Sequence, residues 1–118
     1  MRVLLAENNA ELREFLRLSL NEAGVQAVAS SSVSEVARLV EDESFDALII
    51  DSVLGDGDGI SLTQQIRKGE KGSAIPVVLM SSIGTGLARR MAASAGCNEF
   101  LLKPFGLARL IEVLRQLR

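Results

Sequence analysis

The sequence predicts an α/β fold, with a single doubly wound, five-stranded parallel sheet in the strand order 2-1-3-4-5 flanked by five helices. Short β-branched or aliphatic runs alternate five times with longer stretches whose apolar residues recur three and four positions apart. The central short runs are apolar throughout, which is typical of strands buried on both faces. Parallel neighbours need crossover connections, so each strand is expected to lead through a helix to the next strand.

The apolar runs predict strands at 2–6, 25–29, 47–50, 77–80 and 100–102. Between the third run and the third helix, the glycine-rich segment 55–59 predicts a loop inside the domain.

Helix signals follow each run. Asn9 is a plausible N-cap and Gly24 a stop for the first helix, and Ser32 with Glu35 has the spacing of a capping box for the second. The third helix is expected at about 60–68, and the fourth at 87–95, ended by Gly96. The expected apolar stripes are Leu12, Phe15, Leu16 and Leu20 in the first helix, Val36, Leu39 and Val40 in the second, and Leu107, Leu110, Ile111 and Leu114 in the fifth.

Composition fits one domain spanning residues 1–118, because 47% of the residues are hydrophobic and 24% are charged. Neither a long apolar stretch nor a signal peptide is recognisable, so we expect a cytoplasmic protein without membrane insertion. The net charge is −2 and no run of Lys or Arg is long enough to follow a phosphate backbone, so direct nucleic-acid binding is not expected. Histidine is absent and Cys97 is the only cysteine, which excludes an internal disulfide, the usual zinc sites and a histidine base.

Polar side chains follow the predicted strands where ligands of open parallel sheets bind. Glu7 and Asn8 end the first strand, Asp51 the third, Ser81 and Ser82 the fourth, and Lys103 the fifth. Oxygen ligands without histidine or thiolate suit a hard cation such as Mg²⁺, and an adjacent lysine suits a phosphate. The predicted chemistry is therefore phosphoryl transfer.

Four segments, "RVLLAENNAELREFL", "FDALIIDSVLGDGDGISL", "IPVVLMSS" and "NEFLLKPF", together resemble the receiver domains of two-component response regulators, which have a flavodoxin-like fold. The resemblance spans nearly the whole chain. It implies that Asp51 is the phosphoacceptor, that Glu7 and Asn8 occupy the acidic-pair positions, and that Lys103 is the family's invariant lysine. It further implies a switch hydroxyl at Ser81 and a switch aromatic at Phe100, while Asp58 and Gly59 match the loop after the acceptor.

As a receiver, the chain would take its phosphoryl group from a histidine kinase or a histidine phosphotransfer protein, and would be a signalling domain that assists its own phosphorylation and dephosphorylation rather than an enzyme. Mg²⁺ would be held directly by Asp51, the Asn8 amide oxygen and the Val53 carbonyl, and through water by Glu7. The change at Ser81 and Phe100 would reach an effector through the fourth helix, fifth strand and fifth helix. Dimerisation through that surface stays open, as do the cognate kinase and the pathway.

Two positions depart from the family pattern. Asn8 stands where an aspartate is usual, which removes a negative charge and should weaken Mg²⁺ binding roughly tenfold for a loss of about 1.4 kcal/mol. Gly55 stands where proline is frequent, and Gly57 adds freedom, so the loop carrying Val53 is expected to be less rigid. Elsewhere, Ser82, Met91 and Cys97 are interpreted as structural small or core residues, and Arg89, Arg90 and Arg109 as a solvated face.

Three other functions share part of this pattern. A pseudo-receiver would use the same fold as an unphosphorylated interaction module, with Asn8 as a sign of a decaying site. Asp51, Ser81 and Lys103 also resemble the nucleophile, hydroxyl and lysine of haloacid-dehalogenase-like phosphatases, but Val53 stands where those enzymes have a general-acid aspartate. A flavodoxin-like FMN carrier would need a hydroxyl- and glycine-rich phosphate loop where this chain has "ENNA".

Overall fold

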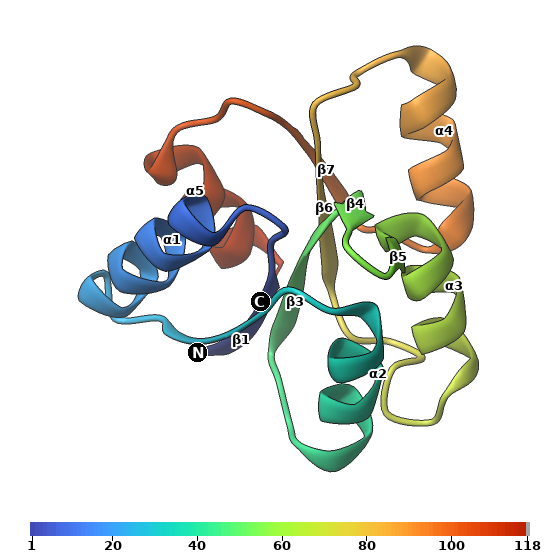
Figure 1. Ribbon diagram of the computed structural model, residues 1–118, viewed down its shortest axis with the longest axis horizontal. Helices are drawn as coiled ribbons and strands as arrows, with labels where there is room; N and C mark the ends of the chain where they lie inside the picture. The colour runs from blue at the N-terminus through green and yellow to red at the C-terminus, as the bar shows by residue number, and fades with distance from the viewer. Residues whose placement is uncertain (118) are drawn as a thin grey trace.

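A computed structural model describes residues 1–117 of the chain. Strands and helices alternate along it as expected, except that two short strands lie between the third strand and the third helix (Figure 1). The strands are β1 (Arg2–Ala6), β2 (Gln26–Ser30), β3 (Ala47–Asp51), β4 (Val53–Leu54), β5 (Gly57–Asp58), β6 (Val77–Ser81) and β7 (Glu99–Leu102). The helices are α1 (Ala10–Glu22), α2 (Val33–Asp42), α3 (Gly59–Lys68), α4 (Gly86–Ala95) and α5 (Leu107–Gln116).

The main sheet has five parallel strands in the order β2-β1-β3-β6-β7, which confirms the predicted order 2-1-3-4-5. β4 and β5 form a separate two-stranded antiparallel hairpin, in which Val53 pairs with Asp58 and Leu54 with Gly57. Because all five main strands run the same way, their carboxyl ends, with Glu7, Asp51 and Lys103 at or just beyond them, meet at one edge of the sheet.

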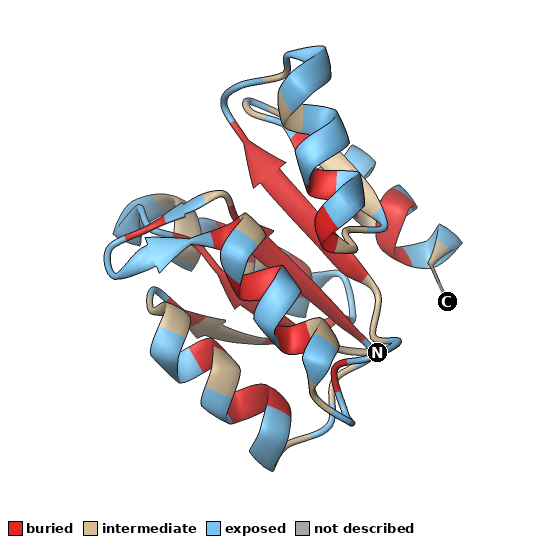
Figure 2. Ribbon diagram, turned by 90° about the vertical axis from the view of Figure 1, so that its right-hand side faces the viewer, coloured by how far each residue is buried: buried red, intermediate tan, exposed pale blue. Residues whose placement is uncertain are grey.

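The two faces of the sheet carry separate cores, because successive strand residues point to opposite sides. In β1, Val3 and Leu5 pack with residues of α1 and α5, whereas Leu4 and Ala6 pack with residues of α2, α3 and α4. Figure 1 shows the same division, with α1 and α5 on one side of the sheet and α2 to α4 on the other. In Figure 2 the central strands are red, because every residue of β3 and β6 is buried between these helix layers.

Local capping fixes where the helices begin and end. Asn9 accepts a hydrogen bond from the Leu12 N–H, as an N-cap of α1 should, and Ser32 does the same for the Glu35 N–H in α2. Gly24 follows α1 with φ +88° and Gly96 ends α4 with φ +105°, a left-handed conformation that costs glycine little. These predicted boundaries are confirmed.

Some predicted details were wrong. Phe15 was placed on the buried stripe of α1 but is 59% exposed, and Met91 was placed among structural and core residues but is 49% exposed. Ser82 is exposed as well.

The segment 55–59 is not simply a loop, because Gly57 pairs in the β4–β5 hairpin and Gly59 already begins α3. An added Cβ at Gly59 would lie only 2.3 Å from the Asp51 carbonyl oxygen, so this position requires glycine.

Across the part of the chain that the structure describes, none of the helices combines the length and the apolar character needed to traverse a lipid bilayer.

Candidate functional site

A polar pocket of about 260 Å³, here called the strand-end pit, lies at the carboxyl edge of the sheet. The structure brings six of the predicted site residues together there, whereas Phe100 does not line it. Ser82, which was expected at the end of the fourth strand but interpreted as structural, lines it too, together with Asn9, Ser52 and Ile83, to which the sequence assigned no role at the site. The six residues are Glu7, Asn8, Asp51, Val53, Ser81 and Lys103.

Lys103 joins the two carboxylates of the pit. Its Nζ donates to Glu7 Oε1 at 2.5 Å and to Asp51 Oδ2 at 3.2 Å. The Lys103 side chain is 17% exposed, and those of Glu7 and Asp51 are 1% and 9% exposed. Charge attraction is screened little at such depth, so the ammonium holds β1, β3 and the chain after β7 together at this point.

Burial raises the pKa of the Glu7 carboxyl above its ordinary value, and the neighbouring Asp51 carboxylate acts in the same direction. Hydrogen bonds from Lys103 and from the Asn9 N–H to Glu7 oppose this effect. The ionised form of Glu7 therefore depends on the hydrogen bonds that it accepts from Lys103 and from the Asn9 N–H.

Asp51 is held by main-chain donors on both sides. Its Oδ2 accepts from the Asn8 N–H at 3.3 Å and its Oδ1 from the Val53 N–H at 3.4 Å. Both bonds are long, so the carboxylate is oriented without saturating its acceptor capacity. A carboxylate in this position can bind a cation or attack an electrophile from the pit.

The oxygen donors around the pit fit a hard divalent cation. Asp51 and Glu7 supply carboxylates, Asn8 an amide oxygen and Val53 a main-chain carbonyl, which are the ligand types that Mg²⁺ accepts. Within residues 1–117, no cluster of three His, Cys, Asp or Glu side chains is found, and Asn8 stands in the third acidic position of the pit. The donor set therefore suits Mg²⁺ in kind while offering it little negative charge.

The side chains of Ser81 and Phe100 have their contacts with residues other than Asp51. Ser81 Oγ accepts from the Ile83 N–H at 3.0 Å and donates to the Ile83 carbonyl at 3.2 Å. The Arg89 guanidinium lies over the Phe100 ring, 4.6 Å from its centroid, and Arg89 Nε donates to the Gly84 carbonyl at 3.3 Å. Ser81 thus lines the pit while its hydroxyl is bonded to the chain before α4, whereas Phe100 contacts α4 through Arg89 and does not line the pit.

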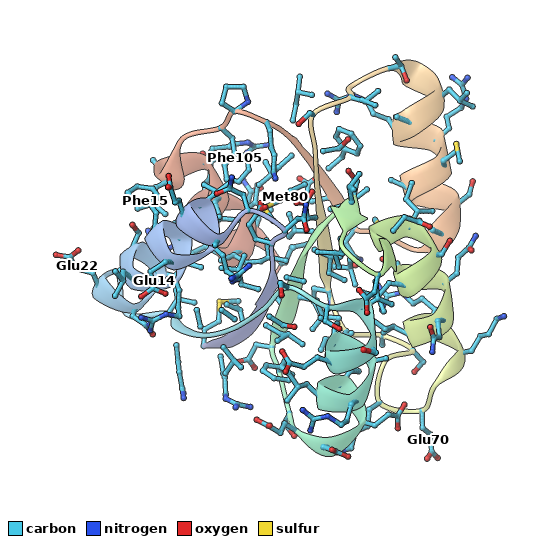
Figure 3. The ribbon with its side chains drawn as sticks, in the orientation of Figure 1. Glu14, Phe15, Glu22, Glu70, Met80 and Phe105 are labelled. Carbon is cyan, nitrogen blue, oxygen red and sulfur yellow. The ribbon has the colours of Figure 1, made fainter. Side chains whose placement is uncertain are left out.

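A second, apolar cleft of about 500 Å³ opens beside the pit and is here called the α1–α5 cleft. It shares Ser82 and Lys103 with the pit, and Phe15 of α1 and Phe105 before α5 contribute aromatic surface (Figure 3). Its other lining residues are Leu12, Leu16, Pro104 and Leu107. The exposure of Phe15 is explained by its position at the rim of this cleft.

Comparison with known proteins shows which family the chain resembles. A family model described as the response regulator receiver domain matches residues 3–115. The KDP operon transcriptional regulatory protein KdpE of Escherichia coli K12 is 31% identical over 113 residues, covering 96% of this chain and 49% of its own length. The chain spans about half the length of this relative and of the regulators GltR and CusR, so it corresponds to one part of them.

Solved structures agree in fold. The receiver domain of the sensor histidine kinase PA1611 from Pseudomonas aeruginosa PAO1, which has a magnesium ion coordinated in its active-site cleft, is 28% identical with a TM-score of 0.90. The alignment covers 98% of this chain and 94% of that domain. The chemotaxis protein CheY4 of Vibrio cholerae, at 18% identity and TM-score 0.94 over 99% of this chain and 98% of its own, shares the fold.

Proposed function

Because the chain belongs to the family of response regulator receiver domains, we propose that its phosphoacceptor is Asp51 and that residues 1–118 work as one receiver domain. The phosphoryl donor would be a phosphohistidine of a histidine kinase or of a histidine phosphotransfer protein. The observation that carries this proposal is the contact of Lys103 with both Asp51 and Glu7 inside the strand-end pit.

The proposed reaction is a displacement at phosphorus. An Asp51 carboxylate oxygen forms a bond to phosphorus while the bond from phosphorus to the donor imidazole nitrogen breaks, and the leaving imidazole takes a proton from water. The product is an acyl phosphate, which water later hydrolyses to return the carboxylate. The domain thus assists its own phosphorylation and dephosphorylation and acts on no separate substrate.

Charge neutralisation accounts for most of the help that a protein gives to phosphoryl transfer. Lys103, 3.2 Å from Asp51, is positioned to bind an oxygen of the incoming phosphoryl group. Mg²⁺, when bound, neutralises further charge on the phosphoryl oxygens. Asp51, the Asn8 amide oxygen and the Val53 carbonyl are the residues proposed to hold it, with Glu7 acting through water.

The α1–α5 cleft is proposed as the docking surface for the donor protein. It is apolar and open, and it shares Ser82 and Lys103 with the strand-end pit, so a partner seated in it reaches toward Asp51. Apolar clefts with exposed aromatic residues are typical of protein interfaces. The donor's phosphohistidine would enter from this side.

The output surface is proposed on α4, β7 and α5. Ser81 would turn toward the phosphoryl group, and Phe100 would lose its contact with Arg89 as α4 adjusts. Leu87 and Met91 on α4 and Leu102 on β7 are 61%, 49% and 43% exposed, which gives an effector domain or protein apolar surface to bind.

Acetyl phosphate with Mg²⁺ tests the assignment directly. The wild-type chain is expected to gain the mass of one phosphoryl group, and Asp51→Asn to gain none while keeping its fold. Asp46→Asn is a matched control, because Asp46 lies at the opposite edge of the sheet, where it accepts from the Arg2 N–H at 2.6 Å. Labelling of Asp51→Asn would mean that the acceptor is misassigned, and an unlabelled wild-type chain would favour the pseudo-receiver.

A further inference from the structure

The β4–β5 hairpin carries the Val53 carbonyl, yet its own sequence gives it little stiffness. Gly55 and Gly57 occupy the turn and its return strand, and no proline restricts them. Leu54 is buried in the core at 4% exposure, which fixes the first strand of the hairpin. The tip needs another attachment if the carbonyl before it is to stay in place.

Asp56, at the tip, supplies that attachment. Its Oδ1 accepts from the Val33 N–H at 2.7 Å, and its Oδ2 accepts from Ser32 Oγ at 2.9 Å and from the Ser34 N–H at 3.3 Å. Ser34 Oγ also lies 3.3 Å from Oδ2. These contacts join residues that are 22 to 24 positions apart in the sequence.

The bond from the Val33 N–H, followed by those from Ser32 and Ser34, lowers the pKa of Asp56 to about 2. The carboxylate therefore stays charged at neutral pH, at the helix end where negative charge is favoured. Packing supports the same contact, since an added Cβ at Gly57 would lie 3.1 Å from the Val33 side chain.

Capping alone does not explain Asp56. α2 already has its own N-cap, because Ser32 Oγ accepts from the Glu35 N–H. Asp56 comes from a different element, so its bonds tie the hairpin to α2 in addition to completing the helix end. The hairpin also lies beside the metal-binding candidates, since an added Cβ at Gly55 would be 3.8 Å from Asn8 Oδ1.

We propose that Asp56 is a positioning residue for Mg²⁺ binding: by tying the β4–β5 hairpin to the first turn of α2, it holds the Val53 carbonyl and the Asn8 amide in register with Asp51. This rests on the proposed function of the strand-end pit. Asn8 supplies no charge to attract the cation, so affinity depends more heavily on the placement of the neutral oxygens.

The test measures Mg²⁺ affinity by calorimetry and amide chemical shifts in the unphosphorylated chain, together with the free energy of unfolding in denaturant. Asp56→Asn keeps the shape of the side chain and is expected to weaken Mg²⁺ binding roughly tenfold, as loss of an outer supporting contact typically does. Asp46→Asn is the matched control, because it removes another carboxylate that binds a main-chain N–H, far from the pit. It is expected to bind Mg²⁺ like the wild type.

A second variant separates turn rigidity from general stability. Gly55→Pro stiffens the turn independently of Asp56; an added Cβ at Gly55 lies no closer than 3.8 Å to Asn8 Oδ1, and Gly55 does not have the positive φ that excludes proline. In the Asp56→Asn background it is expected to recover most of the lost affinity.

Wild-type affinity in Asp56→Asn, an equal loss in Asp46→Asn, or no recovery by Gly55→Pro would each overturn the positioning role while leaving the proposed function standing. An absence of Mg²⁺ binding in the wild-type chain would instead remove the metal site of the proposed function and this inference with it.

Discussion

Asn8 is the residue that most distinguishes the strand-end pit from a site with three acidic groups. When Glu7 and Asp51 are both ionised, two carboxylates and one ammonium give the pit a single net negative charge. The Asn8 main chain also donates to Asp51, so this position contributes orientation even without a charge. The missing charge at Asn8 therefore lowers the affinity of the pit for a cation, but it does not remove the oxygen donors that would bind the cation.

Replacing Asn8 by Asp is expected to strengthen Mg²⁺ binding about tenfold, equivalent to about 1.4 kcal/mol. The added carboxylate brings a second net negative charge to the pit, and a hard cation binds charged oxygens more tightly than neutral ones. Calorimetric titration of Asn8→Asp and wild type at one ionic strength checks this. Equal affinities would place residue 8 outside the coordination sphere.

The contacts of Asp56 lead to a prediction of how the free energy of unfolding changes with pH. Its pKa in the folded chain is about 2, below its ordinary value of 3.8, so its contacts favour folding above about pH 4 and lose this effect as the pH falls toward 2. The difference in unfolding free energy between wild type and Asp56→Asn should be constant near neutrality and shrink between pH 4 and pH 2. Urea titrations across this range check the trend, and a difference that stays constant to pH 2 would contradict it.

At the scale of elements, periodicity and capping residues predicted the five main strands and the five helices, with shifts of about one residue at their ends. They succeeded because Asn9, Ser32, Gly24 and Gly96 act through neighbours in sequence. The β4–β5 hairpin was missed because its two-residue strands are too short to show alternation. Asp56 was missed for another reason, since its partners lie more than twenty positions away.

The spacing of apolar residues identified which face of a helix is buried, but it did not identify where that buried face ends. Leu16 and Leu20 are buried as predicted, but Phe15 lies at the edge of the stripe and Met91 faces outward on α4. The positions of Glu7, Asp51 and Lys103 could be predicted to converge because parallel strands end at a common edge. The contact of Phe100 with Arg89 could not, because it depends on how α4 lies against β7.

The α1–α5 cleft leads to a prediction about donor recognition. Phe15→Ala should lower kcat/KM for transfer from a purified histidine kinase that phosphorylates the wild-type chain by roughly tenfold, as loss of an aromatic interface anchor does. Labelling by acetyl phosphate should be unchanged, because this small donor needs no docking surface. Leu18→Ala is the matched control, since Leu18 is 53% exposed on the same helix but does not line the cleft. Equal losses in both variants would contradict the docking role.

At the scale of the whole molecule, the strand-end pit draws on most of the fold. Glu7 follows β1, Asp51 ends β3, Ser81 ends β6 and Lys103 follows β7, while helices on both faces bury these strands. An unfolded chain cannot bring these groups together, so a ligand of the pit binds the folded state alone. Occupancy of the site should therefore be measurable as stability of the entire domain.

Mg²⁺ at one hundred times its dissociation constant is expected to raise the free energy of unfolding by about 2.7 kcal/mol. Urea unfolding with Mg²⁺ and with chelator should give different midpoints and the same slope, because the surface exposed on unfolding does not change. Asn8→Asp should reach this stabilisation at lower Mg²⁺, and Asp51→Asn should lose most of it, because the shared carboxylate is gone. The midpoints could instead coincide at a Mg²⁺ concentration that saturates the chain in calorimetry. This would mean that the ion binds outside the folded pit. The proposed donor set, and its dependence on β1, β3 and the β4–β5 hairpin, would then be wrong.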